Sequence, residues 1–395
     1  MTSLRIRSID IMRGVTLLLM LFVNDLNMDI VPAWLGHTPE DVDGMGLADW
    51  VFPGFLFIAG MSVPFALSKR FAKEEPVNMV IRYIVKRSVS LIIIGVLMLN
   101  TARVDPGLTG LSRNMWALLM YLGVFLLWND YRDADSRFFT IAGFKFFALV
   151  ILVILVFKFN SGKPENNSSL ITGWWGILGQ IGWGYLTAAL TYVVCRDSLF
   201  RTSFVALFFL AMNILDGSGH TDYLDSIRPV LGIVIQGSVP FIVLSGLMGG
   251  LILRKIPTSE YRKMILIFTG MGIIYLGSGI LLRKWFIISK IMATPSWGLI
   301  CTGISFLVYI FLYWITDVKG FSKWAFFIRP AGENSLTTYL APNFLYHLIW
   351  MSGIPVLIYK QSSEPLVVIA GSLAWAILMA GFAALLGRMG IRLRP

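Results

Sequence analysis

The chain has 395 residues, of which 56% are hydrophobic and only 14% are charged, and its mean hydropathy is +0.74. So few charges cannot cover the apolar surface of a soluble protein of this size, and a soluble globular fold is therefore excluded. The formal net charge is +11. Because the basic residues lie in short segments between apolar runs, they indicate membrane-protein loops and no nucleic-acid partner.

Apolar runs long enough to cross a bilayer recur along the chain, without the alternation that is typical of a membrane β-barrel. We therefore expect an all-α, polytopic helical membrane bundle that forms a single domain over residues 1–395. The runs and their breaks predict about twelve spans. These spans are residues 11–30, 49–68, 88–104, 114–128, 138–158, 173–195, 202–216, 230–252, 264–282, 296–315, 332–350 and 366–387.

The distribution of Lys and Arg predicts the orientation. With a cytoplasmic N-terminus, the inner loops and tails carry 23 of them and the outer loops 9, while Lys145 lies within a span. The positive-inside rule thus predicts that both termini are cytoplasmic. No small-residue cleavage site follows the first span, which is therefore expected to be a signal anchor. His37, His220 and His347 then lie at or near the outer face, where acid–base chemistry is expected.

The first span ends in unusually polar residues, "LFVNDLNMDI". Asn24 and Asn27 are three residues apart and Asp25 and Asp29 are four apart, so each pair shares a helix face. An ionisable residue at membrane depth costs at least ~2.5–3.5 kcal/mol and usually faces the protein interior or a wet cavity. Asn24 and Asp25 are therefore candidate functional residues, whereas Asp29 is equally consistent with a helix that simply emerges into water.

A histidine and an aspartate follow in the loop "GHTPEDVDGMGLAD" and the next span. His37 alone would be interpreted as a solvated loop histidine. The acidic residues after it are chemically suited to a hard metal ion, but their spacing matches no metal-binding loop, so no metal is expected. Asp49 opens the second span, in which Gly60 and Ser62 allow neighbouring helices to approach closely.

These segments resemble the heparan-α-glucosaminide N-acetyltransferase family, which includes bacterial members. The resemblance rests on "RIRSIDIMRGVTLLLMLFVND", the loop histidine and "DWVFPGFLFIAGMS", with matches at Arg5, Ser8, Asp10, Arg13, Gly14, Asn24, His37 and Asp49. Residues 173–186, 294–303 and 318–340 are similar to later helices of that family. The chain departs from the family in three places: its His–Asp spacing is two residues longer, Gly179-Gln180 replaces a Gln-Arg pair, and spans 114–128 and 138–158 form an extra hairpin.

The resemblance implies a multi-pass acetyltransferase of the bacterial cytoplasmic membrane. Such an enzyme takes the acetyl group from cytoplasmic acetyl-CoA and delivers it to an amino sugar or glycan on the outer face. His37 would be the general base or a transient acetyl carrier, and Asp49 would orient its imidazole. Asn24 would donate a hydrogen bond to the thioester carbonyl, and Asp25 belongs to the same expected catalytic group. A homodimer is compatible with the resemblance.

A second set of residues is expected to contact acetyl-CoA. It comprises Arg13, Gln180, Trp297, Glu333, Asn334, Ser335 and Tyr339. Basic residues near inner helix ends would hold the phosphates, although the positive-inside rule explains their position equally well, and helix capping equally explains the polar run from residue 333. The outer tryptophans, which are Trp34, Trp50, Trp174 and Trp297, suit either a sugar or an interfacial aromatic belt.

Two further classes of function stay open. A transporter or flippase of a glycan or lipid intermediate would suit the many spans, although the sequence shows neither an inverted repeat nor paired interrupted helices. A non-enzymatic component that binds outer glycans would use only the aromatic residues. Detectable CoA binding separates the acyltransferase from both. The acceptor, the choice between ping-pong and direct transfer, and the role of His347 also stay open.

Overall fold

The computed structural model describes residues 6–131, 138–162, 168–326 and 328–395, and within these ranges the chain is helical without a β-strand. The predicted all-α class is thus confirmed. The helices are α1 (Arg7–Asp25), α2 (Leu47–Phe71), α3 (Val77–Asn100), α4 (Pro106–Thr109), α5 (Arg113–Trp128), α6 (Phe138–Phe157), α7 (Gly176–Cys195), α8 (Leu199–Gly217), α9 (Arg228–Gln236), α10 (Ser238–Lys255), α11 (Tyr261–Leu282), α12 (Pro295–Tyr313), α13 (Arg329–Glu333), α14 (Ser335–Ser352) and α15 (Pro365–Arg388).

Eight helical segments in the described part of the chain are long and apolar enough to cross a membrane. They are Leu47–Phe71, Thr140–Phe157, Gly176–Cys195, Leu199–Gly217, Ser238–Lys255, Thr258–Leu282, Pro295–Val318 and Pro365–Arg388. The chain is therefore a helical membrane protein. Helices α1, α3 and α14 overlap three further expected spans but are not among the eight, and α1 and α3 carry several charged side chains.

The expected span 230–252 is not continuous. Helix α9 ends at Gln236, and α10 begins at Ser238 after Gly237 with a φ of 72°. A side chain at Gly237 would meet the backbone of α8, so both the left-handed conformation and the close approach require glycine there. The prediction of one helix over this range is wrong because hydrophobicity alone does not report a backbone break.

Helix α2 lies at the centre of the bundle and packs against α1, α7, α10 and α12. The α2–α10 contact is close, because a Cβ atom at Gly60 would meet the Val243 carbonyl and one at Gly246 would meet the Phe57 carbonyl. The expectation that Gly60 allows close helix packing is confirmed. Helices α6 and α11 instead expose most of their apolar surface, as lipid-facing helices do.

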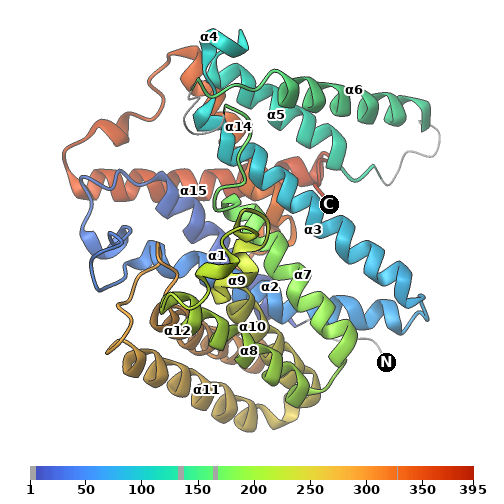
Figure 1. Cartoon of the computed structure of the whole chain (residues 1–395), viewed down its shortest axis with the longest axis vertical. Helices are drawn as coiled ribbons and strands as arrows, with labels where there is room; N and C mark the ends of the chain where they lie inside the picture. The colour runs from blue at the N-terminus through green and yellow to red at the C-terminus, as the bar shows by residue number, and fades with distance from the viewer. Residues whose placement is uncertain (1–5, 132–137, 163–167, 327) are drawn as a thin grey trace.

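Three connecting segments lie together on the left of Figure 1: the loop between α1 and α2, the loop between α11 and α12, and the segment between α14 and α15. The C-terminus and the turn that joins α2 to α3 lie in the right half of the same view. The loop that carries His37 is therefore on the side of the bundle opposite the turn that joins α2 to α3. Helices α5 and α6 pack together as the expected extra hairpin.

Candidate functional site

His37 and Asp49 form a hydrogen-bonded pair. The Nδ1 atom of His37 lies 2.7 Å from Oδ1 of Asp49, while Oδ2 of Asp49 accepts the backbone N–H groups of Thr38 and Gly46, both at 3.0 Å. Asp49 is buried in the first turn of α2, where the helix dipole favours a carboxylate. Because a carboxylate can only accept, Nδ1 carries the proton and Nε2 is the basic nitrogen of an exposed ring.

Lys290 completes this site from the loop between α11 and α12. Its Nζ lies 3.2 Å from Nδ1 of His37, donates to the Ala48 carbonyl at 3.2 Å and lies 3.9 Å from Oδ1 of Asp49. Burial lowers the pKa of Lys290, although the Asp49 carboxylate acts in the opposite direction. Two charged groups from two other segments of the chain, Asp49 and Lys290, therefore meet at the imidazole of His37.

Asp43 joins the loop of His37 to the loop of Lys290. Its Oδ1 accepts the Ile288 N–H at 2.8 Å and its Oδ2 accepts the Arg283 Nε–H at 2.7 Å, and Gly44 donates to the Ile288 carbonyl at 3.0 Å. The N–H of Ile288, followed by Arg283, lowers the pKa of Asp43. Both oxygens of the Asp43 carboxylate thus connect the two loops.

Among the residues that the structure describes, no group of three or more His, Cys, Asp or Glu side chains is arranged to bind a metal ion.

Two tryptophans support the start of α2 from within the protein. The Trp297 indole donates to the Asp49 carbonyl at 3.2 Å, and the Trp50 indole donates to Ser305 Oγ at 3.2 Å. Because both indoles are buried, neither offers a face to a sugar. Trp34 and Trp174 are exposed and could still do so.

Asp25 contacts a different set of residues from His37. It is buried, pairs with Lys360 Nζ at 2.7 Å, and accepts the hydroxyl groups of Tyr359 at 2.6 Å and of Tyr346. Asn27 donates to the Lys360 carbonyl at 3.2 Å in the same region. The structure therefore places Asp25 where it holds the segment between α14 and α15 against the end of α1.

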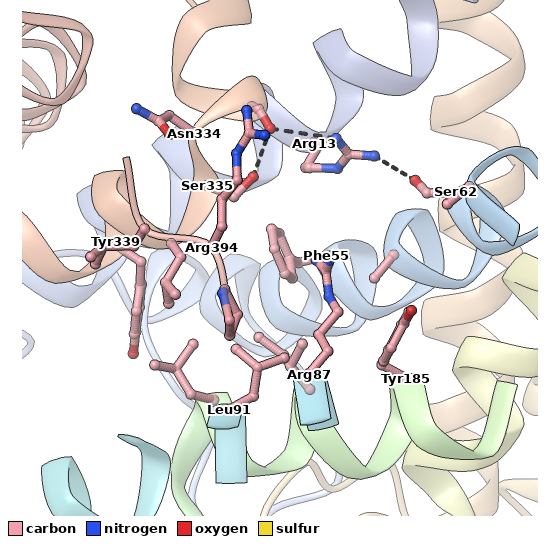
Figure 2. Close-up of a pocket in the computed structure, with 18 of the residues that line it drawn as sticks. Arg13, Phe55, Ser62, Arg87, Leu91, Tyr185, Asn334, Ser335, Tyr339 and Arg394 are labelled. Atoms are coloured by element: carbon pink, nitrogen blue, oxygen red, sulfur yellow. Dashed lines mark hydrogen bonds between the residues drawn. The ribbon is translucent and has the colours of Figure 1, made fainter. Parts of the chain in front are cut away.

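A cavity of about 680 Å³ lies among α1, α2, α3, α7 and the segment from α13 into α14. Figure 2 shows Arg13 and Ser335 along one wall, with Arg87, Leu91 and Tyr185 along the opposite wall. Five of the seven expected acetyl-CoA contacts line this cavity, namely Arg13, Glu333, Asn334, Ser335 and Tyr339. The other two lie elsewhere: Gln180 donates to the Trp174 carbonyl at 3.3 Å, and Trp297 lies beside Asp49.

The cavity is rich in cations. Arg13, Arg70, Lys86, Arg87 and Arg394 line it, against the carboxylates of Asp130 and Glu333. Arg70 is paired with Glu75 at 2.6 Å and Arg394 with Asp130 at 3.3 Å.

Arg87 differs from these paired cations. Its Nη1 donates to the Tyr83 hydroxyl at 3.2 Å, and its guanidinium lies over the Tyr185 ring at 5.0 Å. Its Nε is buried without a hydrogen-bond partner, and no carboxylate among the described residues pairs with it. A half-buried guanidinium whose Nε lacks a partner is suited to bind an anion.

The cavity extends along α1 and α2 toward His37. On α1, Arg13, Leu17 and Met20 line it at helical spacing, and exposed Asn24 is the next residue of the same stripe. On α2, the lining ends at Phe55, which lies six residues after Asp49 and so about 9 Å from it along the helix axis. The expected catalytic Asn24 therefore continues the cavity-lining face of α1 toward the end of the helix from which the loop of His37 begins.

His347 is part of the contact between α14 and α5. Its Nδ1 lies 3.0 Å from Asn114 Oδ1, and its ring packs edge-on against Trp350 with 5.1 Å between ring centres. These contacts favour a structural role. His220 is exposed in the loop after α8.

Sequence reasoning missed Lys290, Lys360 and Tyr359. Lys290 and Lys360 are two of the nine basic residues in the expected outer loops. Because the positive-inside rule disfavours basic residues there, their position was a signal that they have a specific role. Tyr359 carried no such signal, because its partner Asp25 is more than 300 residues away in the chain.

Residues 5–212 match the model of a family described as a domain of unknown function, DUF5009. The match includes His37, Asp49 and Arg87 and ends before Lys290. A comparison with curated proteins gave no match to the chain. Because the matched segment covers more than half of the 395 residues, the chain belongs to the DUF5009 family.

Proposed function

We propose that this protein is a multi-pass acetyltransferase of the bacterial cytoplasmic membrane, which moves the acetyl group of cytoplasmic acetyl-CoA to an amino sugar or glycan on the outer face. One observation carries the proposal: a cation-rich cavity follows α1 and α2 toward a His–Asp pair. By the positive-inside rule, the Arg87 end of the cavity faces the cytoplasm and His37 faces outward.

The lining of the cavity suits the two parts of CoA. Arg87 and the exposed Lys86 offer positive charge to the phosphates, and Arg87 has no carboxylate partner in the described chain that would compete. Toward His37 the lining changes to Leu17, Met20 and Phe55, which suit the less polar pantetheine arm. A volume of about 680 Å³ is within the range of small-molecule sites.

The His37–Asp49 geometry supports nucleophilic or base catalysis at Nε2. In the covalent route, the Nε2 lone pair attacks the thioester carbonyl carbon, the C–S bond breaks, and CoA leaves as the thiolate. The amino group of the acceptor then attacks the acetyl carbon, the bond to Nε2 breaks, and the proton lost by the amine converts the CoA thiolate to the thiol. The sum is acetyl-CoA plus amine giving N-acetyl amine plus CoA.

The direct route uses the same residues in another order. Nε2 takes the proton from the acceptor amine while this amine attacks the thioester, and the proton then passes to the leaving CoA sulfur. In both routes the Asn24 amide would donate a hydrogen bond to the carbonyl oxygen as negative charge develops there.

The test is incubation of the purified protein with acetyl-CoA radiolabelled in the acetyl group, followed by measurement of CoA release and protein-bound label. Wild type, His37→Ala and the control His220→Ala are compared. Protein-bound acetyl label that requires His37 supports the covalent route. CoA binding without such label, together with CoA release that requires both the acceptor and His37, supports the direct route. Absence of CoA binding in the folded wild type would overturn the proposal and favour a transporter.

A further inference from the structure

We infer that Lys290 is a positioning residue that keeps the His37 ring neutral, with the Nε2 lone pair free, by holding a positive charge beside the His37–Asp49 pair, while Asp49 keeps the proton on Nδ1. Its value for acyl transfer rests on the proposed function. The protonation state of His37, however, is a property of the protein alone and is measurable without acetyl-CoA.

Two polar groups lie within hydrogen-bonding distance of Nδ1 of His37, but Nδ1 can form a hydrogen bond with only one of them. The ring nitrogen lies 2.7 Å from Asp49 Oδ1 and 3.2 Å from Lys290 Nζ. A nitrogen that donates its proton to the carboxylate has no lone pair for the ammonium. The ammonium instead donates to the Ala48 carbonyl at 3.2 Å, and its charge stays next to the imidazole.

The charge of Lys290 opposes the effect of Asp49. A carboxylate beside a histidine favours the imidazolium, and a neighbouring cation disfavours it. With Lys290 absent, Asp49 would favour a second proton on Nε2, which would remove the lone pair that both routes need. The cation also disfavours a positively charged acetyl-imidazolium, so it promotes onward transfer to the acceptor.

Contacts within the protein hold the loop of Lys290 in place. Asp43 ties the loop of Lys290 to the loop of His37 through Ile288 and Arg283. Within the loop, Ser289 N–H donates to Thr294 Oγ1 at 3.1 Å, next to the start of α12. Burial lowers the pKa of Lys290, and the Asp49 carboxylate acts in the opposite direction and so favours the charged ammonium.

The other titratable or charged groups of the neighbouring segments either have other partners or are exposed. From α12, the buried Cys301 thiol lies 3.9 Å from the Asp49 carbonyl. Arg283 is paired with Asp43, and Lys284 is exposed in the loop after α11. On the loop of His37 itself, Glu40 and Asp41 are exposed. In the part of the chain that the structure describes, Lys290 is the cation in contact with the ring.

The test is a pH titration of the histidine side chains by ¹⁵N NMR on the full-length protein in detergent. The chain has three histidines, and His37→Gln assigns the signals of His37. Lys290→Met should raise the pKa of His37 by about one unit, Lys290→Arg should keep it near the wild-type value, and the control Lys284→Met should not change it. An unchanged or lowered pKa in folded Lys290→Met would overturn the inference.

A kinetic measurement separates this inference from the proposed function. The acidic limb of the kcat/KM profile for CoA release should move to higher pH by about one unit in Lys290→Met, with recovery in Lys290→Arg. A residue that only supports the fold would lower activity equally at all pH values. If wild type released no CoA, the proposed function would fail, and the NMR titration would still decide the role of Lys290.

Discussion

The carboxylate of Asp49 binds both the ring of His37 and the loop that carries it. One oxygen lies 2.7 Å from His37 Nδ1, and the other accepts the N–H of the next residue, Thr38, at 3.0 Å. A single buried side chain at the start of α2 therefore sets both the position and the tautomer of the imidazole. Replacement of Asp49 should therefore affect the proposed catalysis through its effect on His37.

Asp49→Asn should reduce the rate of His37-dependent CoA release by about 10²–10⁴-fold, because an amide no longer selects the Nδ1-protonated tautomer. The measurement is single-turnover CoA release at saturating acetyl-CoA. Asp41→Asn, in the exposed part of the same loop, is the control and should behave as wild type. Wild-type rates in folded Asp49→Asn would contradict the assigned role.

Asn24→Ala should lower kcat by about 10²–10³-fold with little change in the Kd of CoA, because the amide is proposed to bind the oxygen only as it becomes negative. Asn24 is exposed on the α1 stripe that leads from the cavity. Asp29→Ala, another exposed position near the end of α1, serves as control. A loss of CoA affinity at unchanged kcat would place Asn24 in binding instead.

Arg87→Met should weaken CoA binding by about 10–100-fold, since a hydrogen bond to a charged group contributes about 1.5–3 kcal/mol. Isothermal titration calorimetry of the detergent-solubilised protein at two salt concentrations measures this change. Arg82→Met, an exposed arginine of the same helix, should have little effect. Equal losses in both variants would indicate a general effect of charge and no site at Arg87.

Asp43→Asn should destabilise the protein near neutral pH by less than about 1 kcal/mol, because the Asp43–Arg283 pair is partly exposed. The pKa of Asp43 is lowered in the folded protein from 3.8, so its charged form contributes stability above that pH and loses the contribution as pH falls below it. Melting temperatures of wild type and variant should therefore differ at pH 7 and converge toward pH 3. A difference that grows on acidification would refute this interpretation.

Lys360→Met should destabilise the protein more than Asp25→Asn. The Asp25 side chain is fully buried, whereas that of Lys360 is 28% exposed. Loss of the lysine therefore leaves the buried Asp25 carboxylate without its ion-pair partner. Loss of the aspartate charge leaves the Lys360 ammonium, which still reaches water. Removing one partner of a buried pair costs about 3–5 kcal/mol. Thermal unfolding measures the difference, and a fall in kcat at unchanged stability in Asp25→Asn would restore its expected catalytic role.

The sequence by itself determined the helical membrane class, because composition and the length of apolar runs depend on no tertiary contact. The helices overlap all the expected spans. Two expected spans are interrupted, 230–252 at Gly237 and 332–350 at Asn334 between α13 and α14. The break at Gly237 depends on the close approach of α8, which hydrophobicity does not encode. The family resemblance, and not the spacing of the two residues, led to the prediction that Asp49 orients His37, and the structure shows the two side chains 2.7 Å apart.

Only the tertiary structure decided which polar residues meet. Asp25 and Asn24 are neighbours in sequence, but successive residues of a helix point about 100° apart, so Asp25 contacts Lys360 and Asn24 continues the cavity stripe. Lys290 reaches His37 across 253 residues because Asp43 joins their loops. Long-range pairings of this kind depend on how the helices pack, and no local pattern in the chain reports that.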